Sequence, residues 1–133
     1  SHINAFRQYL DLTEQDLPVS KLREENLLLK PVTQMALAHV ALMAQRKGIS
    51  WVSIVDKLNM IDWSFDNDMW FNILVIGSAN KKMITGKDSI RSAGAVISYM
   101  LMGDRMTQAE IADVRQIIRN AKNDENATLP SMV

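Results

Sequence analysis

Four oxygen-bearing side chains alternate along one short stretch of the chain: Asp62, Ser64, Asp66 and Asp68. A calcium-binding loop begins with this spacing, because side chains two residues apart can reach the same ion. Such a loop also needs a glycine at its sixth position and a glutamate at its twelfth, where this chain has Asn67 and Ile73. The pattern therefore favours a solvated loop with capping side chains over a metal site.

Two further patterns fall short of a catalytic or ligand-binding motif. The segment from Gly86 to Ser89 resembles a phosphate-binding loop, but Lys81 stands where the motif needs glycine and Asp88 where it needs serine or threonine. His39 lies within an apolar helical pattern, where a single histidine is more often a core residue than a base. We expect no catalytic residue, metal site or cofactor in this chain, and whether the whole protein is an enzyme stays open.

Clustered cations could contact phosphate, and the sequence has one such cluster: Lys81, Lys82, Lys87 and Arg91. It spans a predicted turn and the beginning of the next helix, and phosphate contacts of this kind position DNA without reading its sequence. The chain has 15 basic and 15 acidic side chains, so it lacks the broad basic surface of a typical nucleic-acid-binding protein. A solvated turn is the favoured interpretation, and weak DNA binding is the alternative.

Large apolar side chains offer a second possible binding surface. Trp51, Trp63 and Trp70 could stack on bases or on a partner, but packing in the core is the favoured interpretation. Nine methionines could mark an adaptable interface. Three of them fit the apolar faces of predicted helices and are therefore assigned to the core: Met35, Met43 and Met100.

The elements that must position these side chains are mostly helical. Hydrophobic residues recur at three- and four-residue steps in four stretches, which is the period of a helix packed on one side. The first begins at Pro31 and stops at Gly48, and the second follows a cap at Ser50 and runs to Ile61. The third begins at Asp88 or Ser89 and stops at Gly103; the fourth follows Thr107, whose spacing to Glu110 predicts a capping box, and runs to Asn120.

One β-hairpin is predicted between the second and third helices. Aromatic and β-branched residues at 70–76 favour a strand, 83–85 favours its partner, and 77–82 is rich in turn-forming residues. Before Pro31 we expect a short helix at 4–12, a connection at 13–20 and a partly helical segment at 21–29. Residues 121–133 are polar with Pro130, so we expect a frayed tail.

These elements predict a mainly α fold: one helical domain over residues 1–133, with four or more helices and one β-hairpin (α+β). A chain of 133 residues with 47% hydrophobic side chains can bury one core. There is no cysteine and no apolar run near the ~20 residues of a membrane span, so we expect a cytoplasmic protein with no membrane partner. The chain begins Ser1-His2 without methionine, which suggests a fragment of a larger protein.

One segment carries a family resemblance. After the second predicted helix the chain reads Ile61-Asp62-Trp63-Ser64, then Asn67, then Trp70, followed by the hairpin, a helix and the Thr107 helix. This order resembles the C-terminal part of DGQHR-domain proteins of the DndB type, which are associated with DNA phosphorothioation. The resemblance covers roughly residues 29–120, and the defining Asp-Gly-Gln-His-Arg motif is absent from the chain.

The resemblance implies a non-catalytic helical module of a bacterial protein linked to DNA sulfur modification or restriction. Such a module would act through contacts with the rest of its parent protein or with a partner protein, or through weak DNA contacts. In that setting we expect the loop Asp62–Trp70 to be structural, with Asp62 and Ser64 capping backbone groups and Trp63 and Trp70 holding the hairpin to the helices. The alternative is a stand-alone helical interaction or dimerisation domain unrelated to DNA, and the oligomeric state stays open.

Overall fold

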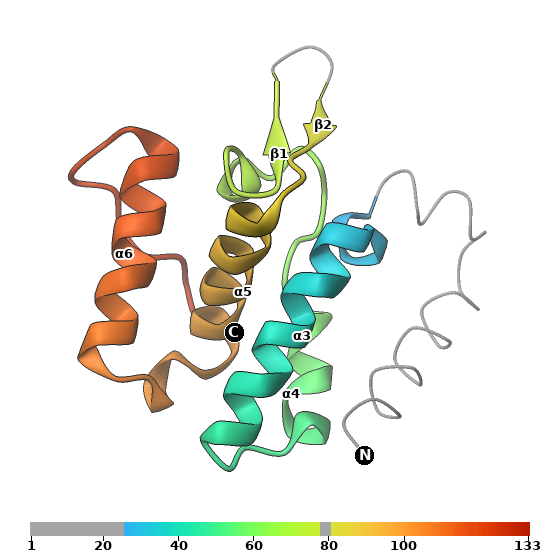
Figure 1. Ribbon diagram of the computed structural model, residues 1–133, viewed down its shortest axis with the longest axis vertical. Helices are drawn as coiled ribbons and strands as arrows, with labels where there is room; N and C mark the ends of the chain where they lie inside the picture. Colours follow the sequence, from blue (N-terminus) through green and yellow to red (C-terminus); the bar gives the residue numbers. More distant parts are fainter. Residues whose placement is uncertain (1–25, 78–80) are drawn as a thin grey trace.

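A computed structural model describes residues 26–77 and 81–133 of the chain. These residues form four α-helices, α3 (Pro31–Arg46), α4 (Trp51–Leu58), α5 (Lys87–Met102) and α6 (Gln108–Lys122), and one antiparallel hairpin of β1 (Val75–Ile76) and β2 (Lys82–Met83). In Figure 1, α3 and α5 lie side by side, α6 flanks α5, α4 flanks α3, and the hairpin extends from one end. The predicted mainly α fold with one hairpin is confirmed.

The α3–α5 contact is close because small residues lie where the helices meet. Ala36 on α3 and Ala93 on α5 are fully buried. A methyl group added at Gly94 would lie 3.1 Å from His39 Cβ and 3.2 Å from the Ala36 carbonyl oxygen. Glycine at this position therefore lets the two helix backbones approach each other without a side chain between them.

The core is continuous across all four helices and the loop before the hairpin. The 3-10 helix Leu27–Leu29 contributes three buried leucines directly before α3. Trp51 of α4 and Trp70 of the loop are the largest fully buried side chains, which confirms the packing assignment for both. Several predictions concern residues outside the described ranges: the elements at 4–12 and 13–20, most of the segment at 21–29, and the tip of the hairpin turn.

The first strand of the hairpin is shorter than predicted. Residues 70–74 were expected to begin the strand, but Asp68–Trp70 is a 3-10 helix and strand pairing starts only at Val75. The Asn67 side chain accepts a hydrogen bond from Met69 N at 3.1 Å and so stabilises the helical turn. Asn72 then takes a left-handed conformation (φ 64°) that breaks an extended chain. The second strand, predicted at 83–85, begins one residue earlier and ends two residues earlier, at Lys82–Met83.

The last helix begins as the sequence predicts, but the tail behaves differently. Thr107 and Glu110 form both hydrogen bonds of a capping box at the start of α6. Helix α6 continues to Lys122, and the tail then returns along the core (Figure 1), where the Val133 N–H donates to the Met100 carbonyl at 2.9 Å. The frayed tail expected over 121–133 is therefore wrong. Its apolar residues, Ala127, Leu129 and Val133, pack against the core and hold it.

The outer face of α3 also departs from the prediction. The apolar pattern placed Met35 and His39 in the core, yet both are exposed, as is Leu42. Helix α3 is apolar around most of its circumference, so its pattern could not tell which side would be covered. None of the helices within 26–77 and 81–133 has the length and apolar character that a membrane crossing requires.

Candidate functional site

The loop between α4 and the hairpin is held by its own polar side chains. The Asp62 carboxylate accepts from Ser64 N at 3.0 Å, and the Ser64 hydroxyl accepts from Asp66 N at 3.1 Å. Asn67 Nδ2 donates to the Asp62 carbonyl at 2.9 Å. The capping roles expected for Asp62 and Ser64 are therefore confirmed. These side chains satisfy backbone groups that no regular helix or sheet would satisfy.

The two tryptophans of this loop stack on each other. The ring centroids of Trp63 and Trp70 are 5.2 Å apart and the ring planes differ by 8°. Each indole N–H reaches a backbone carbonyl at 2.8 Å: that of Trp63 bonds Leu58 at the end of α4, and that of Trp70 bonds Asp62. Both rings are buried, so neither presents a face for stacking on a nucleic-acid base. The pair instead joins the end of α4 to the start of the hairpin.

The surface beside this loop has one shallow pocket with a mixed lining. Its volume is about 200 Å³, and Phe65, Phe71 and Lys81 are among its lining residues. The Lys30 ammonium lies 5.4 Å from the centre of the Phe65 ring, a cation–π distance. The pocket adjoins the hairpin turn, and the ionisable side chains in its lining are Asp68 and Lys81, the latter already paired with Asp66.

The four predicted phosphate-contact residues do not form a free cationic patch. Lys81 Nζ lies 3.0 Å from an Asp66 carboxylate oxygen, and Arg91 lies 3.3 Å from a carboxylate oxygen of Asp113. Lys82 and Lys87 are exposed on β2 and at the start of α5. Two of the four positive charges are thus partly neutralised by neighbouring carboxylates, which reduces the attraction available to a phosphate backbone.

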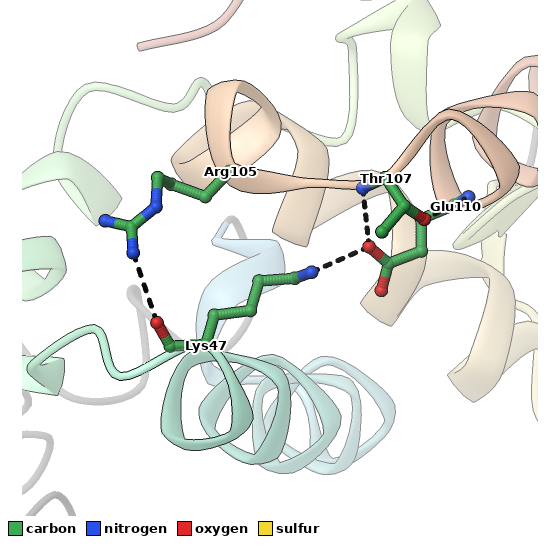
Figure 2. A network of polar contacts seen from close by, with 4 residues as sticks. All are labelled: Lys47, Arg105, Thr107 and Glu110. Atoms are coloured by element: carbon green, nitrogen blue, oxygen red, sulfur yellow. Dashed lines mark hydrogen bonds and ion pairs between the residues drawn. The ribbon is translucent and has the colours of Figure 1, made fainter.

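An ion pair that the sequence did not indicate links the capping box of α6 to the end of α3 (Figure 2). Lys47 Nζ, just past the end of α3, lies 2.7 Å from Glu110 Oε1, and the same oxygen accepts from Thr107 N at 2.8 Å. Arg105 donates to the Lys47 carbonyl at 3.2 Å. The hydrogen bond from Lys47 lowers the pKa of Glu110, and the bond from the Thr107 backbone lowers it further. The carboxylate thus serves both the helix cap and an interhelical ion pair.

We expect Glu110→Gln to lower the free energy of unfolding by at most about 1 kcal/mol at pH 7, because glutamine can still complete the capping box but cannot form the ion pair with Lys47. Because the folded pKa lies below the ordinary 4.5, the stabilisation is present above that value and is lost as the pH falls through the folded pKa. Urea unfolding at pH 7 and at pH 3 measures the difference, which should shrink at the lower pH. Glu125→Gln, at an exposed position in the tail, is the control. A difference that stays constant between the two pH values would contradict this role.

Within the described ranges no group of three or more histidine, aspartate or glutamate side chains is arranged to hold a metal ion. His39, the one histidine described, is exposed at the α3–α5 contact. Asp62 and Ser64 bond to backbone N–H groups, and Asp66 pairs with Lys81.

No family model, curated protein or solved structure matches the chain.

Proposed function

We propose that this chain is a non-catalytic helical module that works through protein contacts. The observation that supports this most directly is that the polar side chains of the loop Asp62–Trp70, here called the tryptophan loop, form hydrogen bonds within the fold. Asp62, Ser64 and Asn67 bond backbone groups of the same loop, and the two indole N–H groups are bonded as well. Groups engaged in this way satisfy backbone polar groups and stabilise the loop, which supports a structural role for this segment.

The resemblance to DGQHR-domain proteins suggests the setting of these contacts. We place the module in a bacterial protein associated with DNA sulfur modification or restriction, where it would contact the motif-bearing part of its parent or a partner protein. The Ile61–Trp70 segment, on which the resemblance rests, is a compact structural unit here. A unit of this kind fits a supporting module better than a site of DNA chemistry.

Weak DNA contact is the second candidate, and one observation favours it. Lys82 and Lys87 remain exposed close to each other in the chain, on β2 and at the first residue of α5. Lys81 and Arg91 would have to leave their carboxylate partners to add to this surface. Any DNA binding should therefore be weak and insensitive to base sequence.

A titration of the full chain with a short DNA duplex at two salt concentrations tests the proposal. We expect binding that is barely detectable at low salt. The logarithm of the binding constant should fall with the logarithm of the salt concentration with a slope of about −0.9 per phosphate contacted, and no more than a few phosphates should be involved. Lys82→Glu and Lys87→Glu should each abolish what binding there is. Arg46→Glu makes the same change of charge at an exposed position at the end of α3 and is the control.

Tight, sequence-selective binding would refute a module that works through protein contacts. Binding that survives both lysine substitutions would refute the assignment of the weak contact to this turn. A chain that shows no binding at any salt concentration would rule out the DNA alternative.

A further inference from the structure

The C-terminal tail, residues 127–133, returns to the end of α5 without forming a helix or a strand (Figure 1). Within the part of the chain that the structure describes, one hydrogen bond joins this segment to a helix: the Val133 N–H donates to the Met100 carbonyl at 2.9 Å. The Ala127 N–H donates only to Asp124, in the turn directly before the tail. Backbone bonding therefore contributes little to holding the tail in place.

Every residue of the tail keeps part of its surface in solvent. The side chains that pack on the core, Ala127, Leu129 and Val133, are half-buried, and Met132 is 52% exposed. A segment with little burial and few hydrogen bonds opens at a lower free-energy cost than the core beneath it. We therefore expect the tail to detach while the helices stay folded.

The surface beneath the tail, formed by Tyr99, Met100 and Gly103 and here called the tail seat, offers the tail space and a hydrogen-bond acceptor. A methyl group added at Gly103, a buried residue, would lie 2.8 Å from Met132 Sδ and 2.9 Å from the Tyr99 ring. Glycine thus leaves the room that the methionine side chain occupies. The Met100 carbonyl belongs to the last turn of α5, where carbonyls have no acceptor role within the helix and need another donor.

These contacts define the chemistry that any occupant of the tail seat must have. It needs a free backbone N–H for the Met100 carbonyl and, one residue earlier, a flexible apolar side chain to lie over Gly103. The thioether of a methionine also suits a neighbouring aromatic ring. No side chain between Ala127 and Val133 is charged, so the seat is filled by an uncharged, mainly apolar segment.

The tail competes with any other segment for this seat because it belongs to the same chain. A tethered segment acts at an effective concentration on the order of mM. The apparent affinity of a competing segment is reduced by the fraction of chains whose seat is open. The attachment of the tail therefore sets how tightly another segment must bind to replace it.

We propose that residues 127–133 are a releasable strap over a protein-contact surface, the tail seat, and that a segment of a partner protein with the tail's own pattern replaces them there. The proposal rests on the proposed function, since it identifies a surface through which the module makes protein contacts. It commits to an uncharged segment of a partner protein as the occupant.

Amide hydrogen exchange of the full 133-residue chain, followed by nuclear magnetic resonance, tests the release of the tail. The protection factor of the Val133 N–H should be at least about 100-fold lower than that of the slowest amides of α5, because the tail opens without the helices. Equal protection of Val133 and of those α5 amides would show that the tail leaves only when the whole domain unfolds, and would overturn the strap.

A fluorescent peptide with the sequence of residues 124–133 and an amidated end tests the seat, by titration with the full chain and measurement of anisotropy. Met132→Asp weakens the chain's own tail, so this variant should bind the peptide at least about tenfold more tightly than the parent chain. Met60→Asp makes the same change at a position that is 68% exposed, should bind the peptide like the parent and is the control. Adding Gly103→Ala to Met132→Asp should remove the gain, because the methyl group fills the seat, while the φ of −57° at this position accepts alanine without strain.

Equal peptide affinity of Met132→Asp and the parent chain, or a gain that survives Gly103→Ala, would overturn the assignment of the seat. The proposed function would stand in either case, because the duplex titration tests it independently. Tight DNA binding together with peptide binding would reject the proposed function and retain the strap. Sedimentation of the parent chain tests the other occupant: a dimer that the peptide dissociates would show that the tail of a second copy fills the seat, and would overturn the assignment to a partner protein.

Discussion

Trp70→Ala should lower the free energy of unfolding by about 3–5 kcal/mol, as expected for loss of a fully buried aromatic ring whose site cannot collapse completely. The ring is 0% exposed, stacks on Trp63 and donates to the Asp62 carbonyl. Its removal takes away the stacking partner, leaves a cavity and separates the end of α4 from the hairpin. Urea unfolding followed by circular dichroism measures the loss.

Two controls separate the contributions of the ring. Trp70→Phe keeps an aromatic ring but removes the indole N–H, so it should cost less than the alanine substitution. Phe71→Ala changes the next residue, which is 38% exposed, and should cost less again. If Trp70→Ala left the unfolding midpoint unchanged, the assignment of this ring to the core would be wrong.

Gly94→Leu should lower the free energy of unfolding by about 1–3 kcal/mol or more, the usual cost of forcing a larger side chain into a packed interior. A β-carbon at this position would already lie 3.2 Å from the Ala36 carbonyl oxygen, a backbone atom that cannot rotate away. The leucine would therefore push α3 and α5 apart. Thermal or urea unfolding measures the effect.

Ala112→Leu provides the matched control, because it adds a leucine to an exposed position of α6 and should change the stability little. Gly94→Ala provides a finer test. Alanine favours a helix by up to about 1 kcal/mol over glycine, and the close contacts oppose that gain, so the net change should be small. A Gly94→Leu chain as stable as the parent would show that the helices do not approach as closely as described.

The tryptophan loop was predictable from the sequence because its interactions are local. Asp62 and Ser64 each accept from the backbone N–H two residues later, which these side chains do wherever the chain turns. The Thr107 capping box was predictable for the same reason, since its two members stand three residues apart. In the loop and in the capping box alike, the interacting residues lie only two or three positions apart in the sequence.

Residues 70–74 were mispredicted because two local preferences compete there. The aromatic and β-branched side chains favour a strand, yet Asn67 caps a helical turn and Asn72 accepts a left-handed conformation. The two asparagines determine the backbone conformation here. The apolar side chains still reach the core, because Ile73 and Leu74 are buried although they lie outside any strand. The strand propensity of this segment thus predicted the burial of Ile73 and Leu74 correctly but predicted their backbone conformation incorrectly.

Contacts between distant segments could not be predicted from one sequence. Lys47 and Glu110 are separated by 63 residues, and nothing in the spacing of either shows that the end of α3 meets the start of α6. The exposure of Met35 and Leu42 depends in the same way on which side of α3 receives α5. The basic cluster was found by its composition, but the two carboxylates that pair with it, Asp66 and Asp113, follow from the tertiary structure.

The short reach of the bonds in the tryptophan loop has a consequence for how the chain folds. The Trp63 indole and the Asn67 amide each donate to a backbone carbonyl five residues away in the chain, and the Trp70 indole donates to a carbonyl eight residues away. Closing loops of this length costs little chain entropy, whereas bringing Lys47 to Glu110 must close a loop of 63 residues. We therefore expect the loop after α4 to form early in folding, before the end of α3 meets the start of α6.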